Sequence, residues 1–338
     1  MAQIKIGVSI KKDIYNRVGN LLVPANTKLK EEDINKLVNH RVDLREIEFW
    51  IQKDHEAVSD PVNQLIEDAS IQVKEIFDAI RYGHSIPLMQ IKKSLVPGIR
   101  KAAESANLFR LLSGLRSKDD YTYKHNIGVG VLATIIGKWM NLDENELSML
   151  ILGATLHDVG KMKVSNEILH KPGKLTDTEY QLMKRHTIDG YKLLKSTEGT
   201  PHRVALIALQ HHEREDGSGY PFGLKGDRLD DLTQIVSIAD VFHAMTTQRS
   251  YHAASSFFSV IKQMHSDVLG KFNAKIFFVF MNRMMESMVG NEALLTDGRR
   301  GTIVMANRFD PIRPLMKVDS YFIDLSKEHS VNLQEILG

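Results

Sequence analysis

The stretch that decides the fold is His211-His-Glu-Arg-Glu-Asp-Gly-Ser-Gly-Tyr-Pro221, where a predicted helix runs into a glycine-rich turn. Adjacent side chains on a helix diverge by roughly 100°, so His211 and His212 can serve two metal ions rather than one. Upstream, His157 and Asp158 follow a nearly all-apolar helix, and Lys161 comes one turn later. A histidine, a bridging carboxylate and a lysine form a set that handles phosphate. A lone histidine more often caps, packs or lies on the surface, but this clustering favours a functional site.

The composition is that of an ordinary globular protein, with room for two or three compact domains in 338 residues. The 44 basic and 42 acidic residues leave a net charge of +2, so we expect no nucleic acid polymer as a partner. Cysteine is absent, which leaves histidine and carboxylate as metal ligands and favours a cytoplasmic location. Residues 1–10 alternate like a strand rather than a signal peptide. No run of about 18 apolar residues occurs, so no membrane span is expected.

Apolar spacing and turn residues predict four parts along the chain. Residues 1–60 combine short strands with one helix, which predicts a small N-terminal α+β module. Residues 61–114 have the pattern of connecting helices, with a break or kink expected at Pro97-Gly98. Residues 115–290 hold the helices that carry the histidines. Residues 291–338 predict a C-terminal β appendage, with a tight turn at Asp297-Gly298.

Capping signals predict where three of the histidine-bearing helices begin: Asp143-x-x-Glu146, Thr176-x-x-Glu179 and Thr200-Pro201. His157 then falls at the end of the first helix, His186 in the later part of the second, and the histidine pair near the end of the third. Two further helices are predicted at residues 121–140 and 231–246. Together the five helices predict a mainly α protein, built as a helical bundle with a polar pocket at its centre.

Seven side chains of ligand type point out of these helices: His125, His157, Asp158, His186, His211, His212 and Asp240. Five imidazoles and two carboxylates suit two transition-metal ions better than one, and iron or manganese fits better than zinc. Two such ions roughly 3.5–4 Å apart can share a hydroxide that attacks phosphorus, so phosphodiester hydrolysis is expected. The alternative for the two carboxylates is a helix cap or a buried ion pair. For Lys161 the alternative is a solvated cation at a helix end.

Ordered motifs over about residues 115–290 resemble a known family. His157-Asp158 matches the HD hydrolases, and the longer runs look like the HD-GYP subfamily: Tyr121 to His125, His157 to Lys161, Lys171 to Leu175, His211 to Pro221 and Ala239 to Ala244. The resemblance implies an all-helical HD-type bundle with two or three metal ions. It also implies a phosphodiesterase that opens cyclic di-GMP to linear pGpG and can cut onward to GMP.

The resemblance also assigns roles by position. It implies that His125, His157, Asp158 and Asp240 hold one metal, and that Asp158 bridges to a second held by His186, His211 and His212. Lys161 would meet the scissile phosphate and so share the catalytic role with Asp158. Arg249 and Tyr220 match family positions at the nucleotide and in the named turn, and they are candidate substrate-binding residues.

Departures from the family pattern carry expectations of their own. Tyr121 replaces the glutamate of three-metal members, so two divalent metal ions are expected. The run Arg249-Ser-Tyr-His252 ends on histidine where the family has a fixed cation. His252 would then bind substrate only when protonated, with affinity weakening from about pH 6 to 8, unless it simply faces solvent. His243 stands where aspartate is common in the family, and we interpret it as a packing or supporting residue.

The sequence therefore predicts a metal-dependent phosphodiesterase that hydrolyses cyclic di-GMP by two-metal activation of a bridging hydroxide. One alternative is a signalling module that binds cyclic dinucleotides with little turnover. Another is a phosphodiesterase for a different cyclic dinucleotide. Candidate protein partners are a second copy in a homodimer and GGDEF or other signalling proteins.

Overall fold

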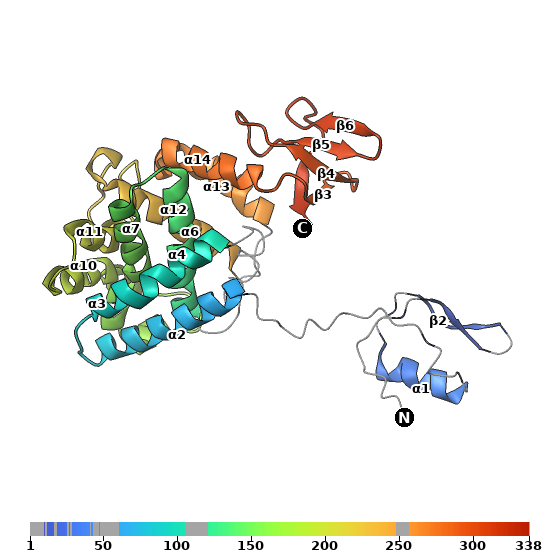
Figure 1. Cartoon of the computed structure of the whole chain (residues 1–338), viewed down its shortest axis with the longest axis horizontal. Coiled ribbons are helices and arrows are strands. Elements are labelled where there is room, and N and C mark those ends of the chain that lie inside the picture. The colour runs from blue at the N-terminus through green and yellow to red at the C-terminus, as the bar shows by residue number, and fades with distance from the viewer. Residues whose placement is uncertain are drawn as a thin grey trace. The chain divides into compact units, whose positions relative to one another are not determined.

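The computed structural model describes residues 10, 12–16, 19–25, 27, 29–40, 42, 47, 61–105, 121–247 and 257–337. The chain divides into two compact units, Met1–Asp60 and Pro61–Gly338 (Figure 1). Each unit is described by itself. The division into four parts expected from the sequence remains a prediction.

The first unit is a small α+β module, as predicted. Strands β1 (Ile14–Tyr15) and β2 (Leu21–Val23) pair antiparallel, and helix α1 (Glu31–Asn39) follows them. Asp33 accepts a hydrogen bond from the Lys30 backbone, which closes the first turn of α1. The unit has its own buried apolar cluster, which consists of Ile10, Leu22, Val23, Leu29 and Leu37. The predicted strand over residues 1–10 lies outside the described residues except for Ile10.

The second unit is a helical bundle with α6 (Tyr121–Trp139) among its neighbours α2 (Pro61–Arg81), α4 (Val96–Ser105), α7 (Glu144–Leu156) and α12 (Asp231–Thr246). Figure 1 shows these helices lying against one another. Helix α6 is buried from His125 to Gly137, and its sequence is apolar on nearly every face. A helix that is apolar all round is stable only inside a core, so α6 has to lie within the bundle.

Further helices connect or extend this bundle: α3 (Leu88–Gln90), η1 (Ile91–Leu95), η2 (Val159–Lys163), α8 (Asn166–Leu169), α9 (Asp177–Lys184), α10 (His186–Ser196), α11 (His202–Gln210), η3 (Gly226–Arg228), α13 (Phe257–Lys271) and α14 (Ala274–Glu286). No break lies at Pro97-Gly98, because α4 runs through both residues; the irregularity is a π-helical turn, η1, directly before α4. Pro97 lies just beyond this π-helical turn, inside a helical run that continues from Leu88, and the widened turn is where the helix accommodates the proline ring and its missing N–H. Within the described residues, no helix has both the length and the apolar character needed to cross a bilayer.

Two of the three predicted caps are present. Asp143 accepts from the backbone of Asn145 and Glu146, and Thr176 forms a capping box with Glu179. The third prediction was displaced by one residue: Pro201, not Thr200, is the N-cap of α11, because its extended backbone precedes the first helical residue. The predicted place of His186 was also wrong. Helix α9 ends at Lys184, and His186 opens the next helix, α10.

The C-terminal part forms the predicted β appendage, as a five-stranded antiparallel sheet in the order β6-β5-β4-β3-β7. Its strands are β3 (Glu292–Leu295), β4 (Arg300–Met305), β5 (Leu315–Val318), β6 (Tyr321–Asp324) and β7 (Leu333–Ile336). The turn between β3 and β4 contains Gly298, whose φ of 86° is the left-handed conformation that glycine adopts without strain. Strand β7 also contacts α13, which ties the sheet to the helices.

Candidate metal centre

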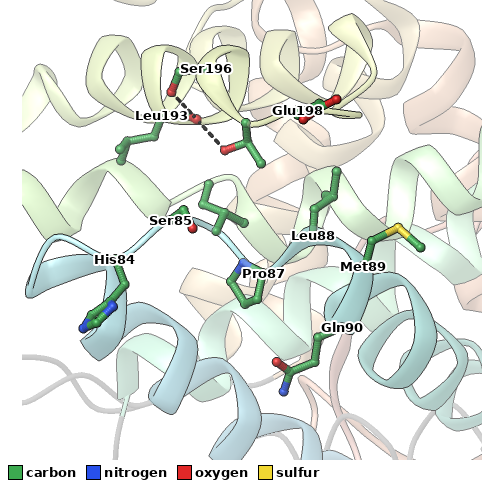
Figure 2. A pocket seen from close by; sticks show the side chains of 11 residues that line it. His84, Ser85, Pro87, Leu88, Met89, Gln90, Leu193, Ser196 and Glu198 are labelled. Carbon is green, nitrogen blue, oxygen red and sulfur yellow. Dashed lines mark hydrogen bonds between the residues drawn. The ribbon is translucent and has the colours of Figure 1, made fainter.

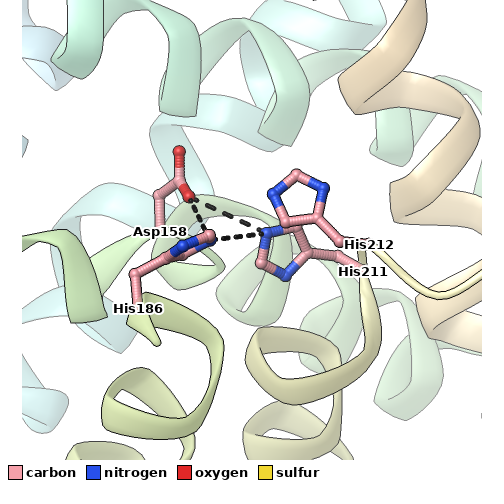
Figure 3. Close-up of side chains that lie close together, drawn as sticks. All are labelled: Asp158, His186, His211 and His212. Carbon is pink, nitrogen blue, oxygen red and sulfur yellow. Dashed lines mark hydrogen bonds and ion pairs between the residues drawn. The ribbon is translucent and has the colours of Figure 1, made fainter. Parts of the chain in front are cut away.

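Seven predicted ligand-type residues come together inside the helical bundle, and six of them are buried. His157 and Asp158 follow α7, His186 opens α10, and His211 and His212 follow α11. His125 comes from α6 and Asp240 from α12. The residues form two groups that share Asp158: one with His186, His211 and His212 (Figure 3), the other with His125 and His157. Only His212 of the seven is partly exposed.

Three of the histidines are oriented by backbone carbonyls of the preceding turn. Nδ1 of His157 donates to Ala154 O at 2.7 Å, and Nδ1 of His186 donates to Met183 O at 2.7 Å. Nδ1 of His211 donates to Ala208 O at 3.0 Å. A carbonyl can only accept, so each Nδ1 carries the proton and each Nε2 keeps its lone pair. The helix ends therefore present three Nε2 atoms to the centre.

These nitrogens surround the Asp158 carboxylate. Oδ1 lies 3.3 Å from His186 Nε2 and 3.8 Å from His211 Nε2, while Oδ2 lies 3.4 Å from His157 Nε2. Lys161 Nζ donates to Oδ2 at 2.5 Å. Asp158 thus offers one oxygen to each group of histidines.

Asp240 lies between two further imidazoles. Its Oδ1 is 3.0 Å from His125 Nε2, and its Oδ2 is 4.0 Å from His212 Nδ1. His243, one turn further along α12, has its Nδ1 3.0 Å from Nδ1 of His125. Asp240 therefore lies between His125 of one group and His212 of the other, as a second carboxylate that faces both groups.

Burial and nearby charges keep the histidines of this cluster neutral and its carboxylates ionised, which are the forms that bind cations. Burial lowers the pKa of His186 to about 4 and that of His212 to about 3, and it also lowers the pKa of His125 and His211. These imidazoles are neutral at pH 7 and keep lone pairs for a metal. Burial alone would raise the pKa of Asp158, but Lys161 and the facing histidines outweigh it and hold the pKa well below the usual range. Burial alone would likewise raise the pKa of Asp240, but its contact with His125 and the other facing histidines, His157 and His212, together hold that pKa well below the usual range.

The residues present fit a divalent metal. Within the described part of the chain, buried Oδ1 of Asp158 accepts no hydrogen bond, although two Nε2 atoms lie within 4 Å of it. An ionised oxygen facing neutral nitrogen lone pairs needs a positive charge between them. The nitrogen and oxygen set suits first-row transition metals.

The loop after His212 places Tyr220 on this cluster. The Tyr220 ring lies 4.6 Å from the ring of His212 and is tilted by 31°. Lys184 Nζ lies 5.6 Å from the Tyr220 centroid and 5.2 Å from that of Tyr180. Sequence reasoning missed Lys184 and Tyr180, whose spacing of four residues on one helix was the available signal. Arg249 and His252 lie outside the described residues.

Glu213 was also missed, although it directly follows the histidine pair. It is buried, and its carboxylate accepts from the backbone N–H of Phe222 at 2.8 Å and of Leu224 at 3.0 Å. The contact closes the loop that carries Tyr220. A glutamate among glycines and polar residues is an ordinary loop residue by sequence, so only the fold shows this role.

A separate surface pocket of about 520 Å³ lies between residues 84–90 and the end of α10 (Figure 2). Its lining includes Ser196 and Thr197, whose hydroxyls both donate to Leu193 O. None of the seven ligand-type residues lines this pocket. The candidate chemistry therefore belongs to the histidine cluster.

The part of the chain that carries this cluster is similar to known proteins. The sequence pattern of the HD domain family matches residues 110–276. Cyclic di-GMP phosphodiesterase PA4108 of Pseudomonas aeruginosa is 30% identical over 254 residues, which cover 75% of this chain and 61% of that protein. Residues 110–276 thus carry the pattern of an HD domain, and the likeness to this relative supports the HD-GYP subfamily. HD hydrolases are metal-dependent, and the cluster supplies the residues to bind metal in this chain.

Other HD-GYP relatives differ in the substrate that their names give. The 3'3'-cGAMP-specific phosphodiesterase 1 of Vibrio cholerae is 33% identical over 205 residues, which cover 60% of this chain and 47% of that protein. The chain thus spans between about half and three fifths of the length of these two relatives. A solved structure of Bd1817, an HDG"Y"P protein from Bdellovibrio bacteriovorus, shares the fold with a TM-score of 0.52 at 18% identity, covering 82% of this chain and 94% of that one.

Proposed function

We propose that this protein is a metal-dependent phosphodiesterase that hydrolyses cyclic di-GMP to linear pGpG, with GMP as the product of a second cut. The observation that carries the proposal is the shared Asp158, whose two oxygens face two separate groups of imidazoles. The name of the Pseudomonas relative supports cyclic di-GMP as the substrate.

The proposed cofactor is a pair of divalent ions, iron or manganese. His186, His211 and His212 would hold one with Asp158, while His125, His157 and Asp240 would hold the other with the same carboxylate. When bound, such a pair activates water for attack on phosphorus and neutralises the charge that develops there. The five imidazoles favour iron or manganese over magnesium, which prefers oxygen ligands.

Other residues would position the substrate. Lys161 is the cation at the edge of the cluster, and its side chain is 24% exposed, so it can reach an incoming phosphate. We propose that Lys161 neutralises the negative charge of a non-bridging phosphate oxygen. Asp158, which accepts a hydrogen bond from Lys161, would hold this lysine in place. Tyr220 presents its ring beside His212, where the rest of the nucleotide would pass. Arg249 and His252 stay proposed nucleotide contacts.

The test is turnover by metal-loaded protein. The full chain is purified without oxygen, its metal content is measured, and it is incubated with cyclic di-GMP and 3'3'-cGAMP. We expect conversion of cyclic di-GMP to pGpG with two metals per chain. Tight binding without product would instead support a cyclic-dinucleotide signalling module. Faster cleavage of 3'3'-cGAMP would support the other substrate, which the name of a Vibrio relative makes the second candidate.

A homodimer, GGDEF or other signalling proteins as partners, and a cytoplasmic location remain part of the proposal. They follow from the subfamily rather than from a contact in the structure. Light scattering of the purified chain checks the dimer directly.

A further inference from the structure

His125 differs from the other histidines of the cluster in how its ring is supported. His157, His186 and His211 lie at helix ends and donate from Nδ1 to a nearby carbonyl. His125 lies within α6, where the backbone carbonyls are engaged in the helix. Its Nδ1 faces Nδ1 of His243 at 3.0 Å, with Thr247 Oγ1 a further neighbour of that His243 nitrogen at 3.4 Å.

The two contacts of His125 decide which nitrogen can bind a metal. Nε2 faces Asp240 Oδ1 at 3.0 Å, inside the ligand cluster. A histidine that ligates through Nε2 carries its proton on Nδ1 and donates it to an outer acceptor. His243 can accept this proton only through the lone pair of its own Nδ1. The imidazole of His243 thus supplies the acceptor that backbone carbonyls supply to the other three.

Gly128 makes the space for this arrangement. A Cβ atom at Gly128 would lie 2.0 Å from Nε2 of His243 and 2.4 Å from its Cδ2. The backbone of Gly128 is helical and has no positive φ, so the position does not require glycine for its conformation. Glycine inside a helix costs about 1 kcal/mol relative to alanine. The missing side chain is therefore explained by the room that the imidazole of His243 needs.

We propose that His243 is a positioning residue for metal binding, which accepts the Nδ1 proton of His125 in a space that Gly128 leaves open. The inference rests on the metal centre of the proposed function. It adds one outer contact that directs Nε2 of His125 toward Asp240, where the cluster would hold an ion. Loss of such an outer partner typically weakens metal binding about 10–100-fold.

The experiment compares two side chains of similar shape at position 243. His243→Asn places an acceptor oxygen near the place of Nδ1, whereas His243→Leu offers no acceptor. Metal affinity and stoichiometry are measured by calorimetry and elemental analysis on the full chain, without nucleotide. We expect His243→Asn to bind within about threefold of the natural protein and His243→Leu to bind about 10–100-fold more weakly. Circular dichroism checks that both variants fold.

A second pair of variants tests the contact with Gly128. Gly128→Ala should displace His243 and weaken metal binding, and the double variant Gly128→Ala/His243→Asn should recover it because the shorter side chain clears the added methyl group. Gly98→Ala is the matched control, since a Cβ there meets nothing within 4 Å.

Natural affinity in His243→Leu, or no recovery in the double variant, would overturn the positioning role while leaving the proposed function intact. A natural protein that binds no metal would overturn both. If the variants change metal affinity as expected but the natural protein has no phosphodiesterase activity, only the proposed function would be overturned.

Discussion

Asp158 is the residue on which both groups of histidines converge. Its position could be predicted because the apolar helix before it and the cap at Asp143 fix the helix phase. The same reasoning placed His125 and Asp240, each on a helix with a clear apolar pattern. The contact between His125 and His243 could not be predicted, since it depends on the distance between two helices rather than on spacing within one.

Asp158→Asn keeps the shape of the side chain and removes its charge. We expect the folded protein to lose metal from both groups and to lose activity by at least about a hundredfold, because both groups then lose the anionic oxygens of the carboxylate that they share. Metal content per chain and turnover of cyclic di-GMP check this. Asp177→Asn, at an exposed position in α9, is the matched control and should change neither. Two bound metals with retained turnover would contradict the shared role of Asp158.

Among the elements, the junction of α9 and α10 shows where sequence reasoning failed. Arg185 joins the two helices with φ −64° and ψ −17°, a conformation within the helical region. No glycine or proline marks the junction, so a continuous helix was the natural prediction. The reason for the break is tertiary: α10 packs against η2, and Gly160 lies against Gly190 there. That packing sets the place of His186.

The close approach of η2 and α10 predicts that Gly160→Ala damages the site. A Cβ at Gly160 would lie 1.9 Å from His186 O and 2.4 Å from Gly190 N, and backbone atoms cannot turn aside. We expect the free energy of unfolding to fall by about 1–3 kcal/mol and metal binding to weaken, as His186 moves from Asp158. Urea denaturation and calorimetry measure both. Gly98→Ala should raise stability slightly, by up to about 1 kcal/mol. An unchanged Gly160→Ala protein would refute the packing argument.

The loop after the histidine pair depends on one buried carboxylate. Glu213→Ala would leave the N–H groups of Phe222 and Leu224 without their acceptor, at a cost of about 2–4 kcal/mol. We expect faster hydrogen exchange at these two amides and a higher KM, because Tyr220 would lose its fixed place beside His212. Exchange measured by mass spectrometry gives the local answer. Glu167→Ala removes an exposed glutamate and should leave exchange in the loop unchanged.

At the scale of the whole molecule, the sequence predicted a helical bundle between a small α+β module and a β appendage, because hydrophobic periodicity changes at both borders. It could not place Tyr180 and Lys184 beside Tyr220, since these contacts join helix α9 to a distant loop. The concentration of neutral imidazoles and low-pKa carboxylates in one core also affects the entire fold. It makes stability of the metal-free protein depend on pH.

The direction of that dependence follows from His186 and His212, whose pKa values fall to about 4 and about 3 in the fold. Below about pH 6.5 these histidines become protonated in the unfolded chain but stay neutral in the folded core. Their contribution to the free energy of unfolding is therefore fully present above pH 6.5 and declines as the pH falls toward 4. The shift of His186 alone corresponds to roughly 3 kcal/mol. Asp158 and Asp240, with lowered pKa values, add a further loss at still lower pH.

We therefore expect the thermal midpoint of chelator-treated protein to drop steadily between pH 7 and pH 4. Added manganese should raise the midpoint strongly at pH 7, because it binds only the folded state, and weakly at pH 5, where protons compete for the imidazoles. Thermal unfolding followed by circular dichroism at each pH, with and without metal, measures both effects. A midpoint that stays constant from pH 7 to pH 4 in the metal-free protein would mean that the buried histidines take up protons in the fold as readily as they do in the unfolded chain. Burial would then not lower the pKa of His186 and His212, and these two histidines would not stay neutral below pH 6.5.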